Sequence, residues 1–158
     1  MTDFSHLNDE GKPTMVDVSE KKITKRSATA RSIVVLPVEV LDKFHDGDIT
    51  TKKGSVFQIA IIAGVMAAKK TGELIPLCHP LGLDNCQITI DFNEQQEVVI
   101  DCKATITAKT GVEMEALTGA SIAALTIYDM CKAMSHDIVI KDTKLMQKTG
   151  GKHDFNRK

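Results

Sequence analysis

Apolar and polar residues alternate over residues 85–92 and again over residues 98–108, on either side of the polar segment NEQQ. A period of two is typical of β-strands, and the short polar break predicts an antiparallel hairpin. Residues 27–36 are rich in small and β-branched residues, and residues 137–146 begin with the same alternation. We therefore predict two further strands in these segments.

Two helices are predicted in the first half of the chain. Pro37 suits the first position of a helix, so a short helix is expected over residues 38–45, stopped by the Asp-Gly dipeptide that follows. A longer apolar helix is expected over residues 55–71, because lysines occupy its last turn and a glycine comes after it. Residues 46–54, between the two helices, are predicted to form a loop.

The longest predicted helix lies within residues 109–136. Thr110 and Glu113 have the spacing of a capping box, in which a hydroxyl and a carboxylate satisfy the first free N–H groups of a helix. The helix is therefore expected to begin near Gly111. Residues 116–128 carry no charge, and small or apolar residues occupy every face. Such a helix must be covered on most sides.

The elements follow one another as strand, helix, helix, strand, strand, helix and strand. This order predicts an α+β fold with one four-stranded antiparallel sheet and helices packed on one face, and a ferredoxin-like sandwich is the simplest topology. A chain of 158 residues with 42% hydrophobic residues suits one domain. We expect a flexible arm over residues 1–14, a single catalytic domain over residues 15–147 and a flexible basic tail over residues 148–158.

The overall composition argues against several classes of protein. A formal net charge of −1 gives no general reason to expect nucleic acid or a membrane surface as a partner, and the chain has no Trp and one Tyr for stacking on bases. The longest apolar run, over residues 56–68, is shorter than the roughly 20 residues of a membrane span. The four cysteines show no C-x-x-C pairing and the N-terminus is polar, which predicts reduced thiols in a cytoplasmic protein.

Ionisable residues return at both ends of the uncharged helix. Glu113 and Glu115 lie in its first turns, and Asp129 and Lys132 lie in its last turn. The helix dipole favours acids at the start of a helix, and Asp129 with Lys132 has the spacing of an ordinary i, i+3 ion pair, so a purely structural role is open. However, a carboxylate near the C-terminus of a helix meets an unfavourable dipole. A nearby lysine or an electropositive ligand is therefore expected beside Asp129.

Two loops carry further candidate residues. The loop over residues 46–54 delivers Lys52 and Lys53 to the N-terminus of the next helix, which favours an anion there, although a solvated surface loop is the commoner explanation. The loop over residues 74–83, LIPLCHPLGL, places His79 in an apolar segment punctuated by prolines.

Familiar catalytic and metal-binding motifs are absent. Cys78 and His79 are adjacent but have no second pair at metal-ligand spacing, so no metal site is predicted. The G-x-S-x-G turn of many hydrolases is missing, a cysteine nucleophile has only Cys78 beside His79 in its favour, and KTGGK in the tail lacks the pattern of a phosphate loop. What remains are ionisable residues at the ends of elements, which suit phosphate binding and proton transfer without a bound cofactor.

Several motifs carry a family resemblance. The segments LIPLCHPL, KTGVEMEALT, ALTIYDMCKA and the terminal K-x-GGK resemble the molybdenum cofactor biosynthesis protein C family, MoaC, the cyclic pyranopterin monophosphate synthases. The resemblance implies a lyase that rearranges (8S)-3′,8-cyclo-7,8-dihydroguanosine 5′-triphosphate to cyclic pyranopterin monophosphate and releases diphosphate. It also implies a ferredoxin-like, cofactor-free homohexamer, a trimer of dimers with sites at the dimer interface.

The resemblance also implies roles for individual residues. The catalytic aspartate of the family falls on Asp129, its neighbouring lysine on Lys132, and a further lysine on Lys53 in preference to Lys52. The substrate-contacting positions fall on Leu77, Cys78, His79, Met114, Glu115 and Arg26. We expect Asp129 and Lys132 to transfer protons, and Lys53 to act as an acid or base or to bind phosphate. The arginine and the histidine are expected to orient the substrate and to contact its phosphate groups.

Two questions stay open at this point. The competing class is a non-catalytic phosphate-ligand sensor or assembly subunit on the same sandwich, because one fold hosts many roles. On one straight helix, Glu115 and Asp129 would be about 21 Å apart along the axis, too far for one compact nucleotide to touch both. If both belong to a substrate site, the chain has two separate sites or a neighbouring chain completes each one, and we favour a shared site.

Overall fold

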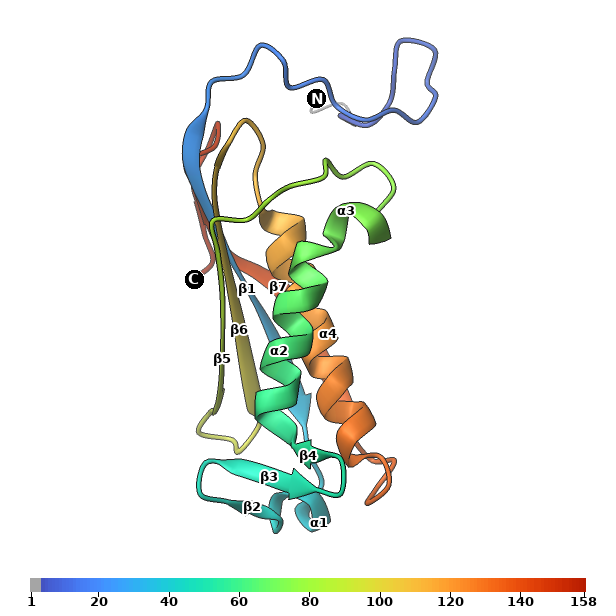
Figure 1. Cartoon of the computed structure of the whole chain (residues 1–158), viewed down its shortest axis with the longest axis vertical. Helices are drawn as coiled ribbons and strands as arrows, with labels where there is room; N and C mark the ends of the chain where they lie inside the picture. Colours follow the sequence, from blue (N-terminus) through green and yellow to red (C-terminus); the bar gives the residue numbers. More distant parts are fainter. Residues whose placement is uncertain (1–3) are drawn as a thin grey trace.

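Five strands form the main sheet of the computed structural model, which describes residues 4–158 (Figure 1). They lie in the order β5-β6-β1-β7-β8, and each neighbouring pair is antiparallel. Their bounds are β1 Thr24–Val35, β5 Asn85–Phe92, β6 Val98–Ala108, β7 Val139–Thr149 and β8 Phe155–Asn156. The predicted hairpin is confirmed as β5 and β6, and β1 and β7 confirm the two further strands. Residues 1–3 of the predicted arm lie outside the described residues.

Two long helices, α2 (Val56–Lys69) and α4 (Glu113–Cys131), lie side by side on one face of this sheet (Figure 1). Helix α4 packs on β1, β6 and β7, while α2 packs on β5 and on α4. Two short helices, α1 (Val38–Leu41) and α3 (Thr71–Leu74), complete the helical elements of residues 4–158. The fold is therefore α+β with a mainly antiparallel sheet. No helix in the described residues is both long and apolar enough to cross a membrane.

The core lies between the sheet and the two long helices. Along β6, alternate residues are buried: Val98, Ile100, Cys102, Ala104 and Ile106. The residues between them point to the other face of the sheet. Small residues of α4 meet this surface from above: Ala116, Gly119, Ala120, Ala123 and Ala124. The buried side chains of the strands and the small residues of the uncharged helix thus form one core.

Helices α2 and α4 approach each other closely at Gly64 and Gly119. A Cβ atom added at Gly64 would lie 2.8 Å from the carbonyl oxygen of Gly119 and would also collide with the side chain of Ile88 on β5. A Cβ atom added at Gly119 would lie 2.5 Å from Sγ of Cys102 on β6. Since real Cβ atoms do not sustain such distances, both helices require glycine at this crossing.

The predictions for residues 38–45 and 46–54 are wrong in part. Helix α1 ends early, and a small three-stranded sheet follows it, made of β2 (Phe44–His45), β3 (Asp48–Thr51) and β4 (Gly54–Ser55). Asp46 and Gly47, with φ of 51° and 84°, connect the paired strands β2 and β3. Positive φ at both central positions is typical of a type I′ turn, which matches the twist of a hairpin. The Asp-Gly dipeptide is therefore the turn of a hairpin.

The capping box predicted for the last helix is also wrong. Helix α4 begins at Glu113, its N-cap residue is Val112, and no side chain caps it. Oε1 of Glu113 instead accepts a hydrogen bond from Nζ of Lys148 at 3.1 Å. A charge-assisted bond to β7 thus replaces the weaker local bond to the backbone near Thr110.

Two further boundaries differ from the predictions. The main sheet has five strands rather than four, because β8, in the predicted tail, pairs with β7. The helix predicted over residues 55–71 is divided, since α2 ends at Lys69 and α3 begins at Thr71. The hydroxyl of Thr71 donates to the carbonyl oxygen of Ala68 at 2.9 Å, a side-chain bond at the point of division. The flexibility of the arm and of the tail stays a prediction.

We expect Gly64→Ala to destabilise the protein, although alanine is by itself the better helix former by roughly 0.5–1 kcal/mol. Overpacking against the Gly119 carbonyl and Ile88 should cost about 1–3 kcal/mol, so the clash should dominate. Urea unfolding measures the difference in the free energy of unfolding. Gly82→Ala is the matched control, because a Cβ atom at Gly82 meets nothing within 4 Å. Equal stability of the two variants would contradict the close crossing.

Candidate active site

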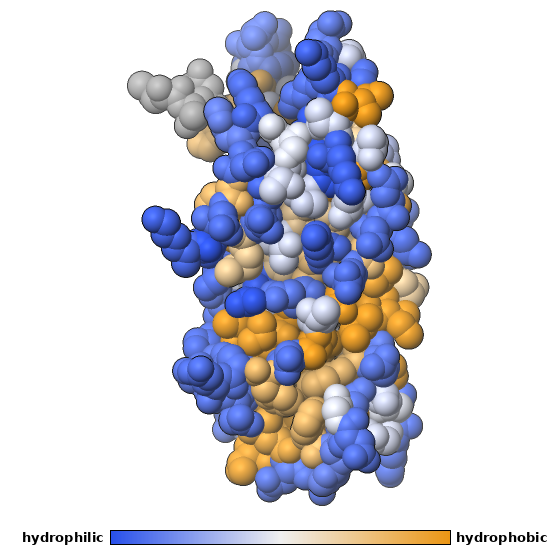
Figure 2. Space-filling model, turned by 90° about the vertical axis from the view of Figure 1, so that its left-hand side faces the viewer, coloured by the Kyte–Doolittle hydropathy of each residue, from blue (hydrophilic) through white to orange (hydrophobic). Residues whose placement is uncertain are grey.

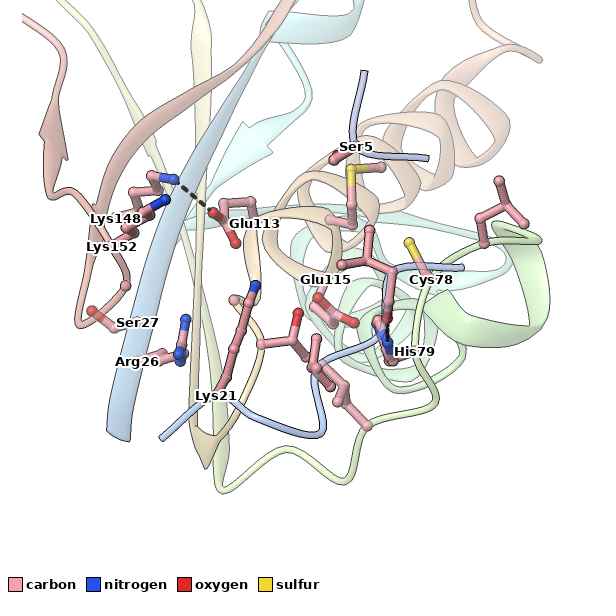
Figure 3. A pocket seen from close by; sticks show the side chains of 18 of the residues that line it. Ser5, Lys21, Arg26, Ser27, Cys78, His79, Glu113, Glu115, Lys148 and Lys152 are labelled. Carbon is pink, nitrogen blue, oxygen red and sulfur yellow. Dashed lines mark hydrogen bonds and ion pairs between the residues drawn. The ribbon is translucent and has the colours of Figure 1, made fainter. Parts of the chain in front are cut away.

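A cavity of about 490 Å³ lies at the end of the molecule where α4 begins (Figure 3). Its walls come from the N-terminal segment, the start of β1, the loop after α3, the first turn of α4 and the end of β7. All six residues predicted to contact the substrate line it: Arg26, Leu77, Cys78, His79, Met114 and Glu115. The fold thus gathers into one hollow residues that are distant in the sequence.

Cations outnumber carboxylates around this cavity. Besides the predicted arginine, the lining includes Lys21, Lys148 and Lys152, against the two acids Glu113 and Glu115. The three lysines were not among the predicted site residues. The sequence signal for two of them is the double glycine of the predicted basic tail, which Lys148 and Lys152 flank. A cavity with this excess of positive charge suits an anionic ligand.

Backbone contacts hold the predicted binding residues in place. Nε of Arg26, on β1, donates to the carbonyl oxygen of Ala108 at the end of β6, at 3.2 Å. Nε2 of His79 donates to the carbonyl oxygen of Val16 at 2.7 Å, which ties the loop after α3 to the N-terminal segment (Figure 3). Both side chains are therefore held by backbone carbonyl groups, one at the end of β6 and one in the N-terminal segment.

Two groups in the cavity are shifted toward their neutral forms. Glu115 is only 3% exposed, and this burial raises the pKa of its carboxyl, with a smaller contribution from the charge of Glu113. Burial and the nearby charge of Glu115 raise the pKa of the Cys78 thiol. Because the thiolate is the nucleophilic form, this environment disfavours Cys78 as a nucleophile.

A second cluster lies at the other end of α4, around Asp129. Oδ1 of Asp129 is 2.8 Å from Nζ of Lys132, and Oδ2 is 3.1 Å from Nζ of Lys53. The hydrogen bond from Lys132, followed by that from Lys53, holds the pKa of Asp129 below its ordinary value, and Asp129 raises the pKa of Lys132. The two lysines thus offset the unfavourable helix dipole beside this carboxylate, as expected.

All three residues of this cluster are about half exposed. Ion pairs in such positions add little to stability, because water screens them and long side chains lose entropy. The arrangement therefore adds little stability, and it leaves one carboxylate and two ammonium groups open to solvent. Lys53, the predicted choice over Lys52, is the lysine that reaches Asp129.

The structure brings the predicted residues together in two groups, which it keeps apart. Glu115 lies at the start of α4 and Asp129 near its end, so the groups occupy opposite ends of the molecule (Figure 1). At 1.5 Å per residue their separation along α4 is about 21 Å. Neither Asp129 nor its two lysines line the cavity.

We expect Glu115→Gln to stabilise the protein increasingly as the pH rises. A carboxyl with a raised pKa in the folded state contributes stability that is complete below its unfolded pKa and is lost as the pH rises through its folded pKa. Glutamine stays neutral, so the gain in the free energy of unfolding should be small near pH 4 and larger near pH 7. Denaturant unfolding at several pH values measures it. The exposed Glu94→Gln serves as the control, and a gain independent of pH would contradict the role of burial.

Comparison with known proteins shows the family of this chain. The MoaC family model matches residues 15–151. A cyclic pyranopterin monophosphate synthase of Xanthomonas campestris pv. campestris (strain 8004) is 53% identical over 152 residues, which cover 96% of this chain and 92% of that protein. One of Bacillus thuringiensis subsp. konkukian (strain 97-27) is 48% identical over 162 residues, covering 100% and 99%. A molybdenum cofactor biosynthesis bifunctional protein of Synechocystis sp. is 49% identical and is a longer chain, of which 46% is covered. The chain therefore belongs to the MoaC family.

Proposed function

We propose that this chain is a cyclic pyranopterin monophosphate synthase of molybdenum cofactor biosynthesis. In this proposal it converts (8S)-3′,8-cyclo-7,8-dihydroguanosine 5′-triphosphate to cyclic pyranopterin monophosphate and releases diphosphate, as a lyase that needs no bound cofactor. The observation that carries the proposal is the placement of Asp129 between Lys53 and Lys132 in a chain of this family. The four free cysteines agree with a cytoplasmic enzyme.

The two clusters suit different parts of this chemistry. The cation-lined cavity is suited to a triphosphate, because Arg26 and His79 can contact phosphate groups there. Glu115 can contact the nucleobase of the substrate in the same cavity. Opening and reclosing ring bonds requires a base and an acid, which Asp129 and Lys132 can supply. Lys53 can donate a proton or stabilise the charge of the departing diphosphate. Each step therefore has a residue of the required chemistry.

A complete site in this proposal needs two chains. A nucleotide in the cavity of one chain would meet the Asp129 cluster of a neighbour, as at the dimer interface of a homohexamer. The small residues of α4 do not provide a contact surface for a neighbour, because they pack inside the chain. Support comes instead from exposed apolar side chains on the helical face, Ile62 and Met66 of α2 and Leu125 of α4, each at least 50% exposed.

The opposite face of the sheet supports a second kind of contact. Figure 2 shows that hydrophobic residues gather in the lower half of the molecule as seen from the left-hand side of Figure 1. By alternation with the buried positions of β1 and β6, half-buried Ile33, Val35 and Val99 point to this face. A trimer of dimers needs two different interfaces, which these two apolar surfaces could supply.

The fold supports the family topology as part of the same proposal. Without the short β8, the long strands and helices follow the order β1, α2, β5, β6, α4, β7, and the sheet order is β5-β6-β1-β7. This is the split βαβ arrangement of a ferredoxin-like sandwich. We assign the catalytic domain to residues 15–147, between the arm and the tail.

Incubation with the cyclised guanosine triphosphate tests the activity. We expect diphosphate and cyclic pyranopterin monophosphate from the wild type, and a loss of turnover by orders of magnitude in Asp129→Asn and Lys132→Ala, at about 1.4 kcal/mol of transition-state stabilisation per tenfold. The exposed Asp137→Asn is the matched control and should keep normal turnover. Binding of the nucleotide without release of diphosphate would favour the competing class, a phosphate-ligand sensor or assembly subunit.

Complementation tests the shared site. Inactive Asp129→Asn chains, mixed with inactive Glu115→Ala chains under conditions of subunit exchange, should regain part of the activity, because some interfaces then pair both intact residues. A mixture of Asp129→Asn with Lys132→Ala chains should stay inactive, since both changes fall in the same cluster. If subunits exchange but the first mixture regains no activity, either the shared site or the role of Glu115 is refuted.

A further inference from the structure

The N-terminus of α2 is capped from outside the helix, by the carboxylate of Asp48 on β3. Oδ1 of Asp48 accepts the N–H of Phe57 at 2.8 Å, and Oδ2 accepts the N–H of Gln58 at 3.3 Å. Ser55, the N-cap residue, makes no capping bond with its own side chain. The two amides that an N-cap residue would normally satisfy are therefore bonded by a residue from a different element.

These bonds close the β3–β4 hairpin onto α2. Oδ1 of Asp48 also accepts the N–H of Ile49 at 2.6 Å, which fixes the carboxylate against its own strand. The bond to Phe57 spans nine positions of the sequence, and Lys53 lies within that span. At the tip of the hairpin, Oγ1 of Thr51 accepts the N–H of Lys53 at 3.1 Å, which fixes the turn itself. The backbone that carries Lys53 is thus held at its base and at its tip.

The ion pair with Asp129 is too weak to hold the hairpin in place. Lys53 and Asp129 are 56% and 54% exposed, and exposed pairs contribute at most about 1 kcal/mol. The sheet of β2, β3 and β4 is small, with strands of two to four residues, so its orientation depends on what ties it to the rest of the protein, including the buried side chain of Ile49. Asp48 supplies such a tie, through two hydrogen bonds from the backbone of a long helix.

We propose that Asp48 is a positioning residue, which sets the place of Lys53 beside Asp129 by joining the β3–β4 hairpin to the N-terminus of α2. Asp48 does not touch the Asp129 cluster and acts only through the backbone of the hairpin. The catalytic part of this inference rests on the proposed function, whereas the geometric part does not. The sequence pattern predicts a loop over residues 46–54, and nothing in it identifies Asp48 as a cap of the next helix.

A variant pair separates positioning from helix capping. Asp48→Ala removes both bonds to α2. Adding Ser55→Asp supplies a carboxylate at the N-cap itself, where it can reach the same amides of Phe57 and Gln58 while leaving β3 untied. Thermal unfolding should show that the second change restores the stability lost by the first. If the first variant folds poorly, Asp48→Asn, which keeps one acceptor oxygen, takes its place.

The pKa of Asp129, measured by NMR of 13C-labelled aspartate, reports where Lys53 lies without any need for activity. We expect this pKa to rise in Asp48→Ala toward its value in Lys53→Ala, to stay raised after the addition of Ser55→Asp, and to change no further when Asp48→Ala is added to Lys53→Ala. Asn93→Ala removes side-chain bonds to the N–H groups of Gln95 and Glu97 in a remote turn and should leave the pKa of Asp129 unchanged.

Turnover should follow the same cycle. Asp48→Ala should reduce it roughly tenfold to a hundredfold, the effect of a misplaced catalytic group, but less than about twofold in the Lys53→Ala background. An unchanged pKa of Asp129 in Asp48→Ala, an equal loss of turnover in both backgrounds, or full recovery of turnover with Ser55→Asp would overturn the inference. Absence of turnover in the wild type would instead refute the proposed function, and the NMR cycle would still decide the position of Lys53.

Discussion

The contact between Gly64 of α2 and the backbone at Gly119 of α4 sets how deeply α4 lies between the sheet and its companion helix. A larger residue at either position would separate the helices or lift them from Ile88 and Cys102 below. Because α4 is one continuous rod, its position in the middle determines where both of its ends lie. The cavity at one end and the Asp129 cluster at the other are consequently parts of one rigid arrangement.

The two ends of α4 have opposite electrostatic environments. At its start, burial favours the neutral form of Glu115, although lysines and an arginine line the same cavity. At its end, two lysines favour the charged form of Asp129, which stays open to water. Environments that shift two carboxyl groups in opposite directions allow one type of side chain to serve in two different ways. The distance between them is what makes a second chain part of the proposed site.

The sequence predicts those elements that are long enough to show a clear hydrophobic period. Strands β5 and β6 have the predicted bounds, because burial of alternate side chains imposes the same pattern on the sequence. The strands β2 to β4 are too short to show a period of two, and the Asp-Gly dipeptide is the one sequence signal that indicates a hairpin there. The capping box failed because Lys148, distant in sequence, is a better partner for Glu113. Ionisable residues at element ends, such as Glu115 and Asp129, were candidates from the sequence pattern, and the family resemblance added their roles and further positions such as Arg26. Their division into two groups depends on tertiary structure that no local pattern contains.

The central strand of the sheet has consequences for how the protein is made. Strand β1 is flanked by β6 and β7, so Thr24 pairs with Ala108 and Ser27 pairs with Thr149. During translation β1 emerges before both partners, and Ser27 and Thr149 are 122 positions apart in the sequence. One hydrogen-bonding edge of β1 therefore stays open until β7 has been synthesised, and such long-range pairing is slow to form. An unpaired strand edge is prone to association with other chains, so the nascent protein is exposed to misassembly until β7 pairs with β1.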